Sequence, residues 1–215
     1  MSSNTVERDL FGNICEFPNT RKDWVGNSHG VFSTLGASNH AKTDRAYRDL
    51  YATPEIATKM LLEMETFSHK VWEPACGLGH ISRVLESHGY EVRSTDIEHR
   101  DFGEGGIDFL KCEDKDVDVD VITNPPYKYA QEFVEKAMEV VADGHKVAMF
   151  LKLTFLEGKN RRQMYEKYPP KVVYVSSSRL GCGKNGIEWK PSSIAYGWFV
   201  WEKGFHGTPG IKWFN

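Results

Sequence analysis

Short apolar runs alternate with segments of helical periodicity along most of the chain. Seven runs predict strands, at residues 70–73, 90–97, 106–110, 119–123, 147–151, 172–175 and 194–201. Between them, apolar side chains recur every three or four residues at 54–62, 81–85, 133–141 and 160–168, a spacing typical of amphipathic helices. This alternation predicts an α/β domain whose parallel sheet is covered by helices on both faces.

The first 46 residues show neither period and are rich in Asn, Ser, Gly and Thr. We therefore expect an irregular N-terminal arm (1–46) and a single domain (47–215). No apolar run reaches the length of a membrane span and the polar start is unlike a signal peptide, so a cytoplasmic protein is expected. The four cysteines lack Cys-x-x-Cys spacing, which predicts reduced thiols and no metal site.

Charge is distributed unevenly along the chain. Residues 1–143 hold 15 Lys and Arg against 26 Asp and Glu, whereas residues 144–215 hold 12 against 4. A basic C-terminal part hints at a polyanionic partner, although solvated lysines on helix faces are the commoner explanation.

The apolar strand at 119–123 runs into Asn124, Pro125, Pro126 and Tyr127. Two prolines cannot extend a sheet, so this turn lies at the carboxyl end of a strand, where open α/β sheets bind ligands. The Asn124 side-chain oxygen and the Pro125 carbonyl can accept both N–H bonds of a planar amino group and free its lone pair for attack. The Tyr127 ring would lie against the acceptor. We predict that all four residues are catalytic; the alternative is a packed Pro-Pro turn.

A second motif follows the strand at 70–73 and consists of Glu73, Pro74, Ala75, Cys76, Gly77, Leu78 and Gly79. A Gly-x-Gly loop between a strand and a helix is a weak signal by itself, and Ser82 replaces the third glycine of a dinucleotide fingerprint. Glu73 at the entrance of the loop would repel phosphates and attract a ligand that carries an ammonium and a sulfonium. This combination points to S-adenosylmethionine.

Four further positions fit such a cofactor. Asp96 ends a strand about twenty residues after the glycine loop, where an acid accepts hydrogen bonds from ribose hydroxyls. Ile97 is expected to cover one face of the adenine. Asp108 and Phe109 are expected at the adenine amino group and ring, although acidic loops are ordinarily only solvated.

The helix at 54–62 is predicted to begin at Pro54 with Thr53 as its N-cap. Its free N–H groups would suit a carboxylate.

A long loop at 176–193 is rich in glycine and basic residues, and such loops are usually functional. We expect it to contact the substrate. The predicted substrate-binding residues are Lys152, Arg161, Arg162, Arg179, Lys184, Trp189 and Lys190.

Together these motifs resemble those of the class I S-adenosylmethionine-dependent methyltransferases, and among them the amino-methyltransferases of DNA bases, over about residues 47–203. The resemblance implies a Rossmann-like, mostly parallel sheet of seven strands, the last antiparallel. It also implies that Tyr51, Thr53 and Pro54 bind the cofactor carboxylate and that Asn124 belongs to the cofactor site too. The layout is similar to small phage and prophage enzymes, which implies adenine N6 in DNA as the acceptor and the cytoplasm of a bacterium or infected host.

The chain departs from that family in having no stretch large enough for a separate target-recognition domain. The same turn also occurs in enzymes that methylate RNA or a protein glutamine, so these acceptors stay open. A regulator that binds nucleic acid or cofactor without catalysis is the remaining alternative.

Overall fold

The computed structural model describes residues 51–177, 180, 183–184 and 194–214, together with two short strands near the N-terminus. The chain divides into two units, Met1–Ser38 and Asn39–Asn215. In the first, β1 (Val6–Arg8) pairs antiparallel with β2 (Ile14–Glu16). The rest of the expected N-terminal arm (1–46) lies outside the described residues.

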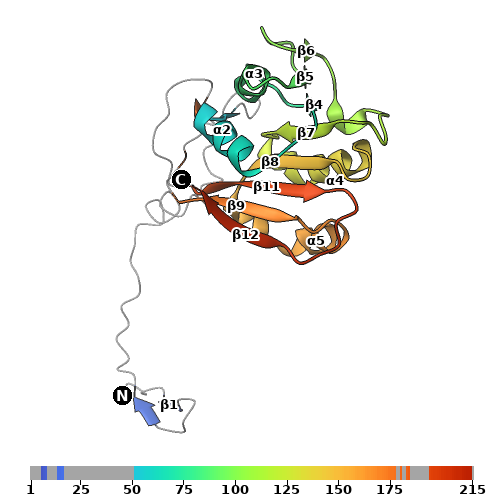
Figure 1. Ribbon diagram of the computed structural model, residues 1–215. Helices are drawn as coiled ribbons and strands as arrows, with labels where there is room; N and C mark the ends of the chain where they lie inside the picture. Colours follow the sequence, from blue (N-terminus) through green and yellow to red (C-terminus); the bar gives the residue numbers. More distant parts are fainter. Residues whose placement is uncertain are drawn as a thin grey trace. The chain divides into compact units, whose positions relative to one another are not determined.

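The second unit is built on one mixed sheet (Figure 1). Its strands are β4 (Lys70–Glu73), β5 (Glu91–Asp96), β6 (Glu104–Gly105), β7 (Asp120–Thr123), β8 (Lys146–Lys152), β9 (Val172–Ser176), β11 (Tyr196–Glu202) and β12 (Gly210–Phe214). They lie in the order β12-β9-β11-β8-β7-β4-β5-β6. Only β11 is antiparallel to its neighbours, β8 and β9. The expected α/β fold with a mostly parallel sheet is confirmed.

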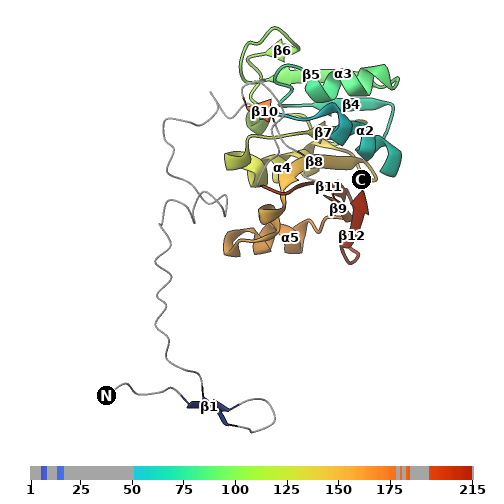
Figure 2. The ribbon, with the colours of Figure 1, turned by 90° about the vertical axis from the view of Figure 1, so that its left-hand side faces the viewer.

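Helices cover both faces of this sheet (Figures 1 and 2). On one face lie α2 (Glu55–Met64) and α3 (His80–Ser87), and on the other lie α4 (Ala130–Val140) and α5 (Arg162–Lys167). Successive residues of the central strands enter opposite cores, as Val121 and Ile122 do in β7. A strand covered on both faces is apolar at most positions, which explains the nearly continuous apolar runs in the sequence.

The sheet has eight strands rather than the seven expected, because the additional strand β12 lies at its edge, parallel to β9. Ile211 and Trp213 in β12 are 55% and 65% exposed. An edge strand with exposed apolar side chains does not show the pattern of a buried strand. The antiparallel strand is therefore not the last one, contrary to expectation.

The third predicted strand, at 106–110, is also wrong. The short strand β6 ends at Gly105, and Gly106 turns the chain with a φ of 82°. Asp108 then accepts a hydrogen bond from the Leu110 amide and starts the 3₁₀ helix η2 (Phe109–Lys111). Local capping by an Asp side chain thus outweighed the apolar pattern.

Within the described residues, no helix combines the length and the apolar character needed to cross a membrane.

Candidate active site

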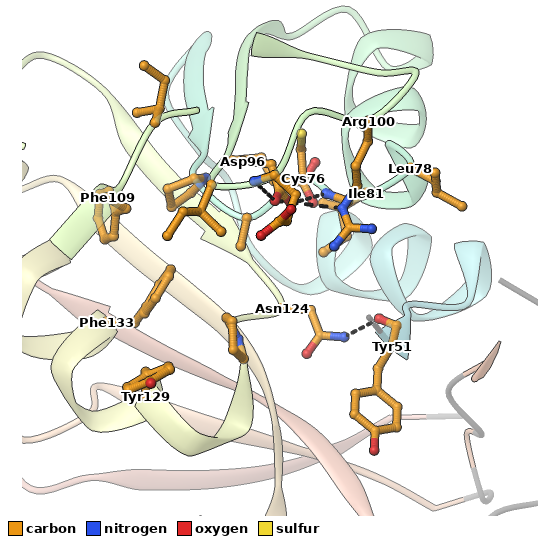
Figure 3. Close-up of a pocket in the computed structure, with 18 of the residues that line it drawn as sticks. Tyr51, Cys76, Leu78, Ile81, Asp96, Arg100, Phe109, Asn124, Tyr129 and Phe133 are labelled. Atoms are coloured by element: carbon orange, nitrogen blue, oxygen red, sulfur yellow. Dashed lines mark hydrogen bonds and ion pairs between the residues drawn. The ribbon is translucent and has the colours of Figure 1, made fainter. Parts of the chain in front are cut away.

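A cavity of about 640 Å³ lies at the carboxyl ends of β4, β5 and β7 (Figure 3). These strands are parallel neighbours, so the residues at their ends meet at one edge of the sheet. Glu73, Asp96 and Asn124 consequently share one wall. All predicted cofactor residues line this cavity except Pro54 and Gly79.

The side-chain amide of Asn124 is held in one orientation by two acceptors. Its Nδ2 donates to the Tyr51 carbonyl at 3.0 Å and to the Thr53 hydroxyl oxygen at 2.9 Å. Because a backbone carbonyl only accepts, the NH₂ group must face Tyr51. Oδ1 therefore faces the other way, as Figure 3 shows, and it is buried without a hydrogen-bond partner among the described residues. A buried acceptor without a partner marks a place where a ligand can donate.

Tyr51 and Thr53 reach Asn124 from a segment far away in sequence. The two-residue strand β3 (Tyr51–Ala52) pairs antiparallel with β10 (Gly183–Lys184) and leads into α2. The predicted start of α2 is wrong by one residue, because Pro54 is its N-cap and Glu55 its first residue. No side chain caps this helix, and the Thr53 hydroxyl is used by Asn124 instead.

The glycine loop folds tightly between β4 and α3. Gly77 and Gly79 have φ values of 55° and 79°, which residues other than glycine rarely adopt. A Cβ atom at Gly79 would also lie 2.6 Å from the Phe102 ring. The Gly77 amide donates to Asp96 Oδ2 at 2.9 Å, so the loop is fastened to the end of β5.

Glu73 is buried behind the loop at the end of β4. Its Oε2 accepts hydrogen bonds from the Ser82 amide, at 2.8 Å, and from the Ser82 hydroxyl. Burial nevertheless raises the pKa of Glu73 to about 8, because the charged form loses its hydration, and the two bonds from Ser82 oppose this only in part. A cation bound beside Glu73 would favour its ionised form.

Asp96 is held at the end of β5 by its neighbours. Besides Gly77, its carboxylate accepts from the Glu98 amide at 2.9 Å, and Arg100 Nε lies 3.7 Å from Oδ1. Burial raises the pKa of Asp96, while the bond from Gly77 and the charge of Arg100 act in the opposite direction. These contacts fix an acidic group on the cavity wall.

Two large apolar side chains, Leu78 and Ile97, line the cavity although they are 37% and 58% exposed. Exposed apolar surface inside a concave site suits a flat apolar ligand group. The predicted contact of Ile97 with the adenine remains a prediction.

The other two predicted adenine contacts are more involved in the fold than the sequence suggested. The Phe109 ring is buried and meets Trp72 edge to face, with ring centroids 5.2 Å apart. Asp108 caps η2 through Oδ1 and pairs with Lys111 through Oδ2 at 2.9 Å. Both residues line the cavity, but each also has a local structural role.

The predicted catalytic turn is divided between two hollows. Pro126 lines the main cavity together with Asn124, whereas Pro125 is buried and does not. Tyr127 lines a neighbouring hollow of about 440 Å³, and its ring lies 5.3 Å from that of Tyr51. The roles predicted for Pro125 and Tyr127 remain predictions.

The predicted substrate-binding cations do not line the main cavity where they are described. Lys152 Nζ lies 4.8 Å from the Tyr127 ring centroid, and Arg162 pairs with Glu166 at 2.8 Å. Arg161 lines the neighbouring hollow, and its Nη1 donates to backbone carbonyls of η4 (Leu153–Leu156) and of the residue that follows it.

Three more of the predicted substrate residues, Arg179, Trp189 and Lys190, lie outside the described residues. Of Lys184, only the backbone pairing of β10 is described.

Sequence reasoning missed Arg100, Tyr129 and Phe133, which all line the cavity. Tyr129 belongs to η3 (Tyr127–Tyr129) and is 41% exposed. Its place two residues after Tyr127 was the available signal. Phe133 has the spacing of a core residue in α4, and nothing in the sequence distinguishes its second role. Among the described residues, no group of three or more His, Cys, Asp and Glu is arranged to hold a metal ion.

Solved structures share this arrangement of strands and helices. The modification subunit of a candidate type I restriction enzyme from Vibrio vulnificus matches 86% of this chain with a TM-score of 0.55 and 14% identity. A candidate class I S-adenosylmethionine-dependent methyltransferase from Listeria monocytogenes matches 83% of it with a TM-score of 0.52 and 12% identity. The chain has the fold of the class I S-adenosylmethionine-dependent methyltransferases.

A candidate RNA methyltransferase from Pyrococcus horikoshii also matches, over 80% of this chain, with a TM-score of 0.53 and 17% identity. The matches cover 50% of the Vibrio subunit, 70% of the Listeria protein and 96% of the Pyrococcus protein. This chain thus spans only half the length of the modification subunit. No protein-family model and no curated protein matches the sequence.

Proposed function

We propose that this protein transfers a methyl group from S-adenosylmethionine to an exocyclic amino group, with adenine N6 in DNA as its acceptor. The observation that carries the proposal is the buried, unpartnered Oδ1 of Asn124. Asn124 lines the same cavity as Glu73 and Asp96. An acceptor for N–H groups is thereby placed beside a pocket suited to a cationic ligand.

The chemistry of the cavity fits the cofactor. Glu73 and Asp96 offer carboxylates to a ligand that carries an ammonium and a sulfonium. The exposed apolar side chains of Leu78 and Ile97 suit a purine ring. The volume of about 640 Å³ lies within the range of roughly 300–1,000 Å³ typical of ligand pockets. When bound there, S-adenosylmethionine supplies a methyl group attached to a positively charged sulfur.

Asn124 would act on the acceptor nitrogen. Its Oδ1 accepts one N–H of the amino group, and the Pro125 carbonyl is proposed to accept the other. As the nitrogen bonds to the methyl carbon, the carbon–sulfur bond would break and leave its electron pair on the sulfur, which becomes a neutral thioether. The lone pair of the nitrogen leaves the ring system, so its N–H bonds become more acidic and the hydrogen bond to Oδ1 strengthens. Such a bond stabilises the transition state more than the ground state. One N–H proton then passes to water.

Three features support DNA as the acceptor. The chain is similar to the modification subunit of a candidate type I restriction enzyme, the C-terminal part is basic, and Tyr129 lines the cavity together with Asn124, where an extruded base could stack. Similarity to a candidate RNA methyltransferase makes RNA the second candidate, and a protein glutamine amide is the third. The unpartnered Oδ1 of Asn124 favours a methyltransferase with any of these acceptors over a regulator without catalysis. Binding of the cofactor alone does not require this oxygen atom.

One assay separates these candidates. Methyl-labelled cofactor is offered with duplex DNA, single-stranded DNA, RNA and protein, and the labelled product is digested and identified by mass spectrometry. N6-methyladenine from DNA is the expected product. Label found only in RNA or only in a glutamine amide would show that this molecule, and not DNA, is the acceptor. No label in any of the four offered substrates would contradict the proposed activity.

A further inference from the structure

Asn124 depends on a second residue for its orientation. Of the two acceptors that hold its NH₂ group, the Tyr51 oxygen belongs to the backbone and the other belongs to the Thr53 side chain. Thr53 is only 3% exposed, so water does not readily replace its hydroxyl. The sequence had placed Thr53 at the cofactor carboxylate and as a helix cap, and in the structure its hydroxyl does not cap α2.

An asparagine amide has little preference of its own for one orientation, since rotation about its terminal torsion is broad and roughly two-fold. One hydrogen bond to Tyr51 leaves part of that freedom. If the amide turned by half a revolution, the NH₂ group would point into the cavity and face the N–H bonds of the acceptor, donor against donor. The Tyr51 carbonyl, which can only accept, opposes this rotation, and the Thr53 hydroxyl oxygen at 2.9 Å from Nδ2 adds a second hydrogen bond to the orientation that Tyr51 selects.

We infer that Thr53 is a positioning residue whose hydroxyl restrains the Asn124 amide in the orientation that the Tyr51 carbonyl selects, with Oδ1 available to the acceptor. The orientation itself follows from the hydrogen bonds, whereas its effect on turnover rests on the proposed function. The two parts are tested by different measurements.

The orientation is tested by NMR on the full-length protein labelled with nitrogen-15. The Asn124 side-chain N–H signals are assigned by their loss in Asn124→Asp, and their exchange with solvent is followed in four proteins: wild type, Thr53→Val, Thr53→Ser and Thr58→Val. Thr58 is the matched control, because it is a buried threonine of α2 whose hydroxyl has no partner among the described residues.

Thr53→Val should speed exchange of the Asn124 N–H groups about ten-fold, as expected for the loss of one hydrogen bond. Thr53→Ser, which keeps the hydroxyl, and Thr58→Val should exchange like the wild type. Unchanged exchange in Thr53→Val would overturn the inference, and so would equally fast exchange in Thr53→Val and Thr58→Val, which would indicate general loosening.

Catalysis is then tested with S-adenosylmethionine and the acceptor identified by the labelling assay. Thr53→Val should lower kcat about ten-fold, with little change in the Kd of the cofactor measured by calorimetry, and Thr53→Ser should restore most of it. An increased Kd for the cofactor at unchanged kcat would show that Thr53 acts in cofactor binding, and it would overturn the inference. Altered exchange in a protein that methylates nothing would leave the positioning intact and remove the proposed function.

Discussion

Arg100 Nε lies 3.7 Å from Asp96 Oδ1 on the wall of the cavity and has no hydrogen-bond partner among the described residues. A cation therefore stands beside the acid that is proposed to bind the cofactor ribose. Its charge offsets part of the attraction that the cavity would exert on a sulfonium. Arg100→Gln should therefore favour S-adenosylmethionine over S-adenosylhomocysteine, which lacks this charge, by about two-fold or more. Calorimetry with both ligands gives the ratio of their Kd values. An unchanged ratio in Arg100→Gln would show that the charge of Arg100 does not affect binding of the sulfonium.

Asp96 itself should matter more for cofactor binding. It accepts hydrogen bonds from the Gly77 and Glu98 amides, so Asp96→Ala removes both the predicted ribose contact and two bonds that shape the glycine loop. We expect the Kd of the cofactor to rise about 10- to 100-fold, as for the loss of hydrogen bonds to a charged group. Asp143→Ala, an exposed acid outside the cavity, serves as the control. Equal affinities for the two variants would exclude Asp96 from the site.

The raised pKa of Glu73 predicts that the free energy of unfolding depends on pH. Its pKa is raised from 4.5 to about 8 by burial, so the folded state binds its proton more tightly than the unfolded chain does. The stability that this proton contributes is complete below pH 4.5 and is lost as the pH rises through 8. Glu73→Gln, which cannot ionise, should flatten this decline. Urea unfolding from about pH 5 to about pH 9 measures the free energy of unfolding of both proteins. If it declined equally with pH in wild type and Glu73→Gln, Glu73 would not be protonated in the folded protein.

Two tyrosines compete for the role of stacking on the acceptor base. Tyr129 lines the cavity and is 41% exposed, whereas the Tyr127 ring packs 5.3 Å from Tyr51 and 5.9 Å from Tyr196. Tyr129→Leu should raise the KM for the nucleic acid, consistent with roughly 1–3 kcal/mol per stacked base, and leave the melting temperature nearly unchanged. Tyr127→Leu should lower the melting temperature as well.

The control for both tyrosine variants is Trp213→Leu, which alters an aromatic ring that is 65% exposed on the edge strand. A normal KM in Tyr129→Leu together with a raised KM in Tyr127→Leu would restore the assignment made from sequence.

The sequence predicted the central strands well, because the middle residues of β7 and β8 are buried on both faces and are apolar. The sequence-based prediction was wrong where a single hydrogen bond of a side chain determines the local structure. The side chain of Asp108 starts a 3₁₀ helix in place of a strand, and the Thr53 hydroxyl serves Asn124 rather than a helix end.

Two contacts explain what else was missed in the site. Arg100 approaches Asp96 from four positions further along the chain, in the loop after β5, and the Tyr51 carbonyl meets Asn124 across 73 positions of sequence. A loop has no regular period that would mark the first pair, and spacing along the chain carries no signal for the second. The motif residues could be recognised from sequence, but the atoms that orient them could not.

The central claim is that Asn124 Oδ1 accepts a hydrogen bond from the acceptor nitrogen in the transition state. Its most direct test compares the kcat of Asn124→Ala with that of the wild type, with cofactor affinity measured in parallel. Thr123→Val, which alters an adjacent buried hydroxyl that has no partner among the described residues, is the control. We expect kcat to fall about 100- to 1,000-fold with the cofactor Kd nearly unchanged. Normal turnover by Asn124→Ala would contradict the account.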